Sequence, residues 1–182
     1  MAYTQGDDRS QIRVLVYDLG GGTFDITLVD RTSGSFKPLA FGGNRELGGY
    51  NFDKKIATKM LAQIREKGFQ LNIDPNHPER DIRWASLMHH AEQVKIDLTQ
   101  KPKAVMRKSG VFTDDSPSPK SVQLNFTMTR DEFNELIADE LQETVDQTKA
   151  VLERANVEAS AVDHLILVGG SSRIPVIAER LK

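Results

Sequence analysis

One glycine-rich segment constrains the fold of this chain more than any other part of its sequence. Residues 18–25 read Asp-Leu-Gly-Gly-Gly-Thr-Phe-Asp. Apolar and β-branched runs flank this segment at 12–17 and 26–29, which predicts two strands joined by a glycine turn. Three consecutive glycines are more than a turn requires. Without Cβ atoms the backbone can approach a ligand closely, and successive N–H groups can bind an anion.

A carboxylate stands on each side of this turn, at Asp18 and Asp25, and Thr23 adds a hydroxyl. Phosphate beside two carboxylates requires a cation, and Mg²⁺ suits one or two carboxylates together with phosphate oxygens and water. A tight hairpin whose aspartates merely flank the turn is the better interpretation of three glycines alone. The strand flanks and the paired aspartates favour a phosphate and Mg²⁺ site.

The composition narrows the class of protein. The 182 residues can form one domain, or a lobe with an inserted subdomain, and 38% hydrophobic with 27% charged residues is typical of a globular protein. A net charge of -2 gives no basic excess for nucleic acid or an anionic membrane. The absence of cysteine excludes disulfides and thiolate metal sites and fits the cytoplasm. No apolar run approaches the ~20 residues that span a bilayer.

The first half of the chain predicts a meander followed by two helices. Strands are expected at 12–18, 23–30 and 36–43, and a second glycine-rich loop at 42–49 leads into a helix at 51–68. That loop alone is better explained as a turn, although a helix N-terminus can bind phosphate. Asp53 in the first helical turn is interpreted as an acid that suits the helix dipole.

The helix expected at 80–99 has a core face and a polar stripe of Glu92, Lys95 and Thr99. The simplest interpretation of that stripe is a solvated face with a Glu92–Lys95 pair. Strands at 104–113 and 121–128 form a hairpin. Its tip at 113–120 is expected to be exposed and mobile, with the acid pair Asp114 and Asp115 in solvent.

The last third predicts a helix, a buried strand and a second glycine turn. Thr129 and Glu132 form a capping box that starts a long helix ending near Ala155. The apolar run at 162–168 predicts a strand covered on both faces, as in a parallel sheet. Glycines at 169–170 and a helix beginning at Pro175 follow this strand, which is the usual arrangement for a ligand at the carboxyl edge of a sheet.

These segments carry a resemblance to a known family. Residues 18–25 resemble the second phosphate-binding segment of the actin, hexokinase and 70-kDa heat-shock chaperone superfamily, and the Thr-Phe-Asp ending is most similar to the DnaK-type chaperones. Four further segments resemble that family in the expected order and extend the resemblance over nearly the whole chain: 48–53 (G-G-x-x-F-D), 91–99 (A-E-x-x-K-x-x-L-S), 129–136 (T-R-x-x-F-E-x-L) and 168–175 (V-G-G-S-x-R-I-P).

The resemblance implies an α/β fold, namely an actin-like ATPase (ribonuclease H-like) lobe with a mixed sheet and an inserted α+β subdomain. Residues 1–69 and 129–182 would form the core of the lobe, and 70–128 the inserted helix-plus-strands subdomain. The implied function is the adenine nucleotide-binding second lobe of an ATP-dependent, stress-related folding chaperone. The implied cofactors are ATP or ADP with Mg²⁺.

The resemblance also implies roles for individual residues. Asp18 and Asp25 would hold Mg²⁺ and its waters, and Thr23 would lie near the γ-phosphate and the attacking water. Ile96 stands where some members have an arginine against the adenine, and Tyr50-Asn51 replace a more usual acidic pair. The remaining contacts would be to the phosphates, from Gly20, Gly21, Gly22 and Gly49, and to the nucleoside, from Glu92, Lys95, Ile96, Thr99, Gly169, Gly170, Ser171 and Arg173.

Only the second of the family's two nucleotide-binding lobes is resembled, and the peptide-binding domain is not. We therefore expect an excised lobe that binds nucleotide weakly and hydrolyses it poorly or not at all, because the phosphates must be held from both sides. In the full protein the implied partners are the first lobe, the peptide-binding domain, J-domain co-chaperones and nucleotide-exchange factors.

Three other interpretations remain open. A sugar or acetate kinase of the same superfamily would release ADP in response to its substrate, although residues 80–99 and 169–175 argue against it. A filament-forming, actin-like subunit would sediment in a nucleotide-dependent way. A docking module for nucleotide-exchange factors, compatible with the chaperone interpretation, would lose that binding when the 113–120 tip is deleted.

Overall fold

The computed structural model describes residues 11–32 and 34–182, so the first ten residues and Ser33 lie outside the described part of the chain. The described residues fall into two compact units. The first is drawn from Met1–Gly49, Glu140–Arg173 and Ile177–Lys182, and the second comprises Tyr50–Asp139 and Ile174–Val176. The segment 70–128, expected to be an insertion, lies within the second unit. Each unit is described by itself.

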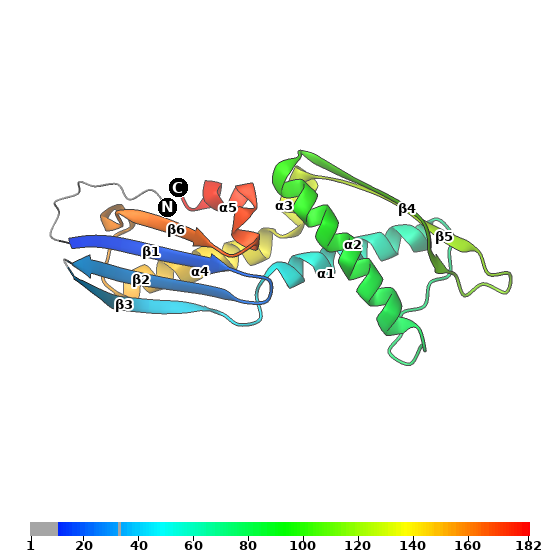
Figure 1. Ribbon diagram of the computed structural model, residues 1–182, viewed down its shortest axis with the longest axis horizontal. Helices are drawn as coiled ribbons and strands as arrows, with labels where there is room; N and C mark the ends of the chain where they lie inside the picture. The colour runs from blue at the N-terminus through cyan, green and yellow to red at the C-terminus, as the bar shows by residue number, and fades with distance from the viewer. Residues whose placement is uncertain (1–10, 33) are drawn as a thin grey trace. The chain divides into compact units, whose positions relative to one another are not determined.

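The first unit contains a mixed sheet, with four strands among the described residues (Figure 1). Strands β1 (Gln11–Leu19), β2 (Phe24–Thr32) and β3 (Ser35–Asn44) form the expected antiparallel meander. Strand β6 (His164–Val168) pairs with β1 in parallel, which gives the order β3-β2-β1-β6. The parallel partner of β1 explains why β6 follows a long helical connection, because adjacent parallel strands need a crossover.

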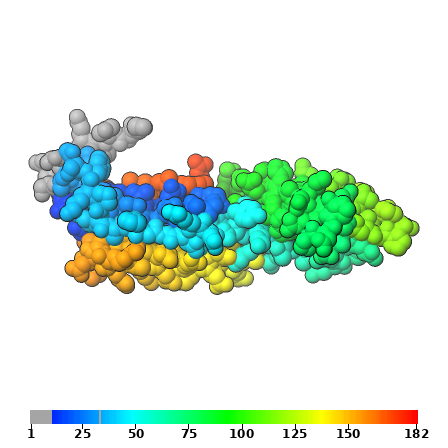
Figure 2. Space-filling model, turned by 90° about the horizontal axis from the view of Figure 1, so that it is seen from below, coloured from blue at the N-terminus to red at the C-terminus, as the bar shows by residue number. Residues whose placement is uncertain are grey.

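Alternation along β1 and β2 produces one buried face of this sheet. Leu15, Tyr17 and Leu19 on β1, with Phe24 and Ile26 on β2, are at most 5% exposed. The Tyr17 and Phe24 rings lie 4.7 Å apart between centroids. Helix α4 (Ala138–Arg154) packs this face from Glu140 onward through a stripe at helical spacing: Leu141, Thr144, Thr148 and Val151. Figure 2 shows α4, in yellow and orange, lying against the blue strands.

Strand β6 is more exposed than expected. A strand covered on both faces was predicted, but Leu165, Ile166 and Val168 are 38%, 46% and 40% exposed. The strand lies at the edge of the described sheet, with β1 as its neighbour there. The apolar run thus predicted the parallel pairing correctly. Burial depends in addition on elements that cover the faces, and the described residues do not cover them fully.

The second unit combines helices with a hairpin (Figure 1). Helix α1 (Gly49–Glu66) continues into it from the end of the first unit, and its expected stripe of Ile56, Met60, Leu61 and Ile64 is buried. Gly68 follows with φ +85°, a conformation that glycine adopts without strain. Helix α2 (Arg80–Gln100) buries Leu87, Ala91, Val94 and Leu98, which confirms its predicted core face.

The hairpin consists of β4 (Lys103–Thr113) and β5 (Ser121–Thr129). Alternate residues of β5 face the core of the unit, and Val122 and Leu124 are fully buried. The predicted capping box is present at the end of β5. The hydroxyl of Thr129 accepts from the Glu132 N–H, and the carboxylate of Glu132 accepts from the Thr129 N–H at 2.7 Å.

The long helix expected from this cap to Ala155 is interrupted. Helix α3 (Arg130–Leu136) ends at Ile137, whose φ of -105° and ψ of 14° leave the helical range, and α4 begins at Ala138. Ile137 is fully buried. A local change of direction at a buried apolar residue leaves the hydrophobic spacing nearly unchanged. The sequence pattern therefore predicts one continuous helix and does not reveal the break at Ile137.

A search of residues 11–32 and 34–182 finds no helix with the length and apolar character needed to cross a membrane. The remaining short elements are two 3₁₀ turns, η1 (Ala159–Ala161) and η2 (Ser171–Arg173), and helix α5 (Pro175–Arg180). Helix α5 begins at Pro175, as predicted.

Candidate functional site

The glycine turn lies at one end of the sheet of the first unit. Asp18 and Asp25 are directly opposite each other across β1 and β2, and the Gly20 N–H donates to the Thr23 carbonyl at 2.9 Å to close the turn. Gly21, Gly22 and Thr23 are exposed. No heavy atom lies within 4 Å of the position that a Cβ would take on Gly21 or Gly22. The outer backbone of the turn is therefore open to a ligand.

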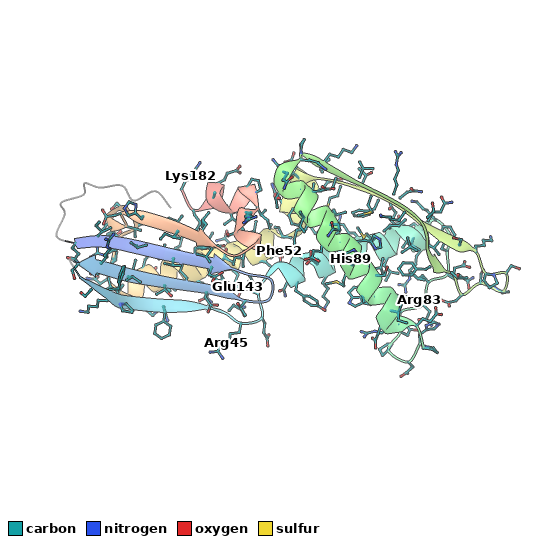
Figure 3. All side chains as sticks on the ribbon, in the orientation of Figure 1. Arg45, Phe52, Arg83, His89, Glu143 and Lys182 are labelled. Carbon is teal, nitrogen blue, oxygen red and sulfur yellow. The ribbon has the colours of Figure 1, made fainter. Side chains whose placement is uncertain are left out.

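The second glycine loop packs directly behind this turn. The Gly49 N–H donates to the Gly20 carbonyl at 3.0 Å. A Cβ on Gly48 would stand 2.7 Å from the Gly21 carbonyl oxygen and from backbone atoms of Gly22. Real Cβ atoms do not approach backbone so closely, so the position requires glycine. The adjoining Asn44 side chain donates to Glu143 of α4 at 2.6 Å, and Figure 3 labels this glutamate.

The turn after β6 makes a third backbone contact with the same segment. Gly169 has φ +90°, and a Cβ there would clash with the Leu19 carbonyl and stand 2.8 Å from Asp18 Oδ1. The buried Ser171 hydroxyl donates to the Gly20 carbonyl at 2.9 Å. Gly170 and Arg173 are exposed. Two of the predicted nucleoside contacts, Gly169 and Ser171, thus lie against the turn. The residues predicted for the phosphates and Mg²⁺ also meet there: Asp18, Gly20, Gly21, Gly22, Thr23, Asp25 and Gly49.

The two aspartates of this turn have the chemistry of a Mg²⁺ site. Like charges directly opposite on adjacent strands repel, and a bound cation removes that repulsion. Mg²⁺ needs only one or two carboxylates when phosphate oxygens and water complete its octahedron. Within the described residues there is no cluster of three or more histidine, cysteine, aspartate or glutamate side chains that could hold a metal alone. The donor set therefore fits a phosphate-bound Mg²⁺ rather than an all-protein metal site.

The predicted polar stripe of α2 lies in the second unit and is more deeply embedded than expected. Lys95 is only 9% exposed, and its ammonium donates to Asp53 Oδ2 of α1 at 2.7 Å. Glu92 and Ile96 are exposed, and the Thr99 hydroxyl donates to the Ile96 carbonyl. The expectation of a simple solvated stripe is wrong for Lys95, because α1 covers it.

Asp53 is the residue that sequence reasoning missed. It was interpreted as an acid that suits the N-terminal end of its helix, whereas it is buried and paired with Lys95. A signal was present, since Asp53 closes the 48–53 segment on which the family resemblance rests. Burial raises the pKa of Asp53 above its ordinary value; the Lys95 hydrogen bond opposes that rise, and the charge of Glu92 adds to it.

The hairpin tip of the second unit differs from its expected state. Asp114 is 4% exposed, and the Asp115 carboxylate accepts from both Nη atoms of Arg83, at 2.6 and 2.9 Å. Arg83 also donates to the Asn72 and Thr113 carbonyls. The prediction of a solvated acid pair is therefore wrong for Asp114, whereas Asp115 is exposed but bonded to Arg83, a buried arginine at the start of α2 (Figure 3).

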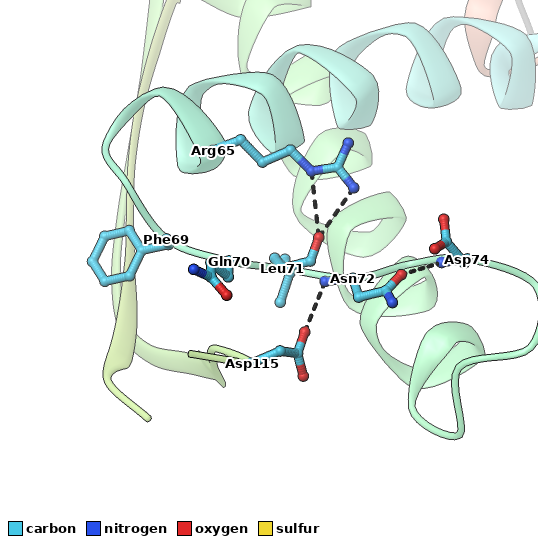
Figure 4. Close-up of a pocket in the computed structure, with 7 residues that line it drawn as sticks. All are labelled: Arg65, Phe69, Gln70, Leu71, Asn72, Asp74 and Asp115. Atoms are coloured by element: carbon cyan, nitrogen blue, oxygen red, sulfur yellow. Dashed lines mark hydrogen bonds between the residues drawn. The ribbon is translucent and has the colours of Figure 1, made fainter. Parts of the chain in front are cut away.

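An open hollow of about 470 Å³ lies beside this tip. Figure 4 shows its lining, where Arg65 donates to the Leu71 carbonyl and Asp115 accepts from the Asn72 N–H. A second hollow of about 310 Å³ in the first unit is lined by residues of β1, α4, η1, β6 and positions 180–182, most of them apolar. None of the predicted site residues lines either hollow.

Comparison with known proteins shows which family the chain belongs to. The family model described as Hsp70 protein matches residues 1–182. A protein named Chaperone protein DnaK from Mycoplasmoides gallisepticum (strain R(low / passage 15 / clone 2)) is 34% identical over 183 aligned positions, which cover 97% of this chain. The chain belongs to the Hsp70 family. It spans 29% of the length of that relative.

Proposed function

We propose that this chain is the second nucleotide-binding lobe of an ATP-dependent folding chaperone, and that its glycine turn binds the phosphates of an adenine nucleotide with Mg²⁺. One observation carries the proposal. Gly21 and Gly22 leave their backbone open between the paired carboxylates of Asp18 and Asp25, while Gly48 and Gly169 buttress the turn at distances that only glycine permits. Such a turn offers N–H donors to an anion and carboxylates to its cation.

The residues have distinct proposed roles at the phosphate end. Asp18 and Asp25 would hold Mg²⁺, and the exposed Thr23 hydroxyl would lie near the γ-phosphate and the attacking water. Bound Mg²⁺ would supply charge neutralisation of the phosphate oxygens. Backbone N–H groups of the turn bind those oxygens. The phosphate-binding set is Gly20, Gly21, Gly22 and Gly49.

The nucleoside contacts are a separate part of the proposal. On the first unit they comprise Gly169, Gly170, Ser171 and Arg173, and on the second unit Glu92, Lys95, Ile96 and Thr99. Exposed Ile96 would pack apolar surface against the adenine. We expect these residues to bind nucleotide without fast hydrolysis, because phosphoryl transfer requires the γ-phosphate and the water to be held from several sides.

The finer fold and the partners follow from family membership as proposals. The sheet order β3-β2-β1-β6 supports an actin-like ATPase (ribonuclease H-like) lobe, with 70–128 as its inserted subdomain. The whole protein would add a first lobe and a peptide-binding domain, and would work with J-domain co-chaperones and nucleotide-exchange factors. The hairpin tip fixed by Arg83 favours a docking role for it as well, because a rigid surface loses less entropy on binding. The cytoplasmic location stays a prediction.

Calorimetric titration with ATP and ADP, each with and without Mg²⁺, tests the proposal. We expect weak binding that Mg²⁺ strengthens in the wild type, at least tenfold weaker binding in Asp18→Asn with Mg²⁺, and no response of that variant to the metal. Asp146→Asn is the matched control, since Asp146 is an exposed carboxylate of α4 in the same unit.

The stability of Asp18→Asn separates a site defect from a folding defect. Replacing one of two opposed carboxylates relieves a repulsion. The variant should therefore unfold at the same or a higher urea concentration than the wild type. Equal nucleotide affinities in wild type, Asp18→Asn and Asp146→Asn would remove the glycine turn from the binding site.

A further inference from the structure

The pair formed by Asp53 and Lys95 is unusual for its depth. Asp53 is 7% exposed and Lys95 9% exposed, and their charged atoms lie 2.7 Å apart. Both residues belong to the second unit, where Asp53 is on α1 and Lys95 on α2. Burying two charges requires removing both from water, and a pair of this kind often contributes no more to stability than an apolar pair of similar volume.

The pair is also incompletely satisfied. Asp53 Oδ1 is buried, and no donor among the described residues reaches it. A buried carboxylate oxygen without a donor destabilises the fold, and such groups in native proteins often mark function. Desolvation raises the pKa of Asp53, and the nearby Glu92 carboxylate acts in the same direction. Stability alone therefore does not explain why an aspartate occupies this position.

The position of Lys95 supplies a reason. Lys95 and Glu92 lie three residues apart on α2, on neighbouring positions of one helical face. Glu92 is exposed, whereas the Lys95 side chain is mostly buried and its ammonium is bonded to Asp53. A lysine free of that bond has about four rotatable bonds and would lose substantial entropy when a ligand fixes it. A lysine already bonded to a buried carboxylate has lost much of that freedom before the ligand arrives.

We propose that Asp53 is a positioning residue for nucleoside recognition: it fixes the Lys95 ammonium so that the α2 face presents a preset donor beside the Glu92 acceptor. The inference rests on the proposed function, because it takes Lys95 and Glu92 to be nucleoside contacts. A donor and an acceptor at this spacing suit the hydroxyl groups of a ribose, which both donate and accept. Asp53 acts through Lys95 and does not touch the nucleotide.

A double-mutant cycle tests this role by measuring ADP affinity in the presence of Mg²⁺. The four proteins are the wild type, Asp53→Asn, Lys95→Met and the double variant. Asparagine keeps the size of Asp53 and an oxygen for Lys95 but removes the charge that fixes it. We expect Asp53→Asn to weaken ADP binding five- to tenfold in the wild type and less than twofold when Lys95 is already methionine.

A phosphate probe and a matched control refine the cycle. Inorganic tripolyphosphate with Mg²⁺ should bind equally to the wild type and Asp53→Asn, since it has no nucleoside. Asp97→Asn on the same helix removes an exposed pair, in which Lys101 and Asp97 lie 2.9 Å apart, and should leave ADP affinity unchanged. A purely structural role for Asp53 would weaken both ligands together.

Each outcome decides the proposal. An Asp53→Asn effect that persists in the Lys95→Met background, or that appears equally with tripolyphosphate, overturns the positioning role. Unchanged ADP affinity in Asp53→Asn, together with a loss in Lys95→Met, overturns it while the proposed function stands. Equal affinities of the wild type for tripolyphosphate and ADP would show that the nucleoside adds no contact, which would overturn the role of Asp53. A wild type that binds neither ligand rejects the proposed function itself.

Discussion

Two cation–carboxylate pairs of the second unit have opposite electrostatics. Arg83–Asp115 and Lys95–Asp53 both join α2 to another segment, with closest distances of 2.6 and 2.7 Å. Hydrogen bonds from Arg83 lower the pKa of Asp115 to about 2. Burial raises the pKa of Asp53 in spite of its lysine. The partners of Asp115 therefore favour its charged form, whereas burial disfavours the charged form of Asp53.

The difference separates a structural pair from a candidate functional one. In the arginine pair, Arg83 makes further hydrogen bonds to Glu79 and to the carbonyls of Asn72 and Thr113. The lysine pair leaves Asp53 Oδ1 without a donor among the described residues. A satisfied network contributes to the fold itself, while an unsatisfied buried charge is better explained by binding.

Replacing Arg83 should have the largest effect. Arg83→Met removes the hydrogen bonds to Asp115 and Glu79 and leaves the Asn72 and Thr113 carbonyls without this donor, so we expect a loss of about 3–5 kcal/mol in the free energy of unfolding. Urea denaturation measures it. Arg80→Met is the control, because the exposed Arg80–Asp81 pair should contribute less than about 1 kcal/mol. Equal, small losses in both variants would contradict a structural role for Arg83.

Apolar replacement of both partners should distinguish the two pairs further. Lys95→Met alone leaves a buried carboxylate unpaired and should cost about 2–3 kcal/mol, whereas Lys95→Met with Asp53→Leu should return within about 1 kcal/mol of the wild type. Arg83→Met with Asp115→Leu should stay destabilised, because the Asn72 and Thr113 carbonyls still lack donors. Chemical denaturation of the four variants measures these stabilities. If the stability returned to the wild-type value only in the double variant of Arg83 and Asp115, the assignment of that pair as the structural one would be wrong.

The smallest effect should appear as opposite pH dependences. The depressed pKa of Asp115 gives stability that is present above about pH 4 and lost as the pH falls toward 2; after allowance for solvent screening it is about 1 kcal/mol. The raised pKa of Asp53 acts in the other direction: its contribution is present below the ordinary value of about 4 and is lost as the pH rises through the folded pKa.

Urea midpoints between pH 2 and 6 measure both contributions. Relative to the wild type, Asp115→Asn should lose less stability on acidification. Asp53→Asn should lose less stability as the pH rises above about 4. Identical pH profiles for the two variants would show that the carboxylates do not differ in the way the structure indicates.

Local signals in the sequence predicted most of the elements. Apolar and β-branched runs beside the glycine turn located β1 and β2, helical spacing located the core faces of α1 and α2, and the Thr129 cap located the start of α3. Each of these signals depends on neighbours within a few residues. The turn from Asp18 to Asp25 was predictable for the same reason, because its glycines, aspartates and strands are adjacent in sequence. Its contacts with Gly49, Gly169 and Ser171 join distant segments, which only the family resemblance brought together.

Properties that depend on distant partners were not predictable. The sequence does not state that Lys95 meets Asp53, 42 residues earlier, or that Asp115 meets Arg83, 32 residues earlier. The tip and the polar stripe therefore looked solvated. The exposure of β6 was missed for the related reason that an apolar run indicates what a strand could bury and not what covers it.

The most direct test is amide chemical-shift mapping of the isotope-labelled chain during titration with Mg²⁺-ADP. The account predicts the largest shift changes at Gly20–Gly22, at Gly169–Gly170 and around Asp53 and Lys95, with Arg83 and Asp115 nearly unchanged. Changes centred on Arg83 and the adjoining hollow, with a silent glycine turn, would contradict it.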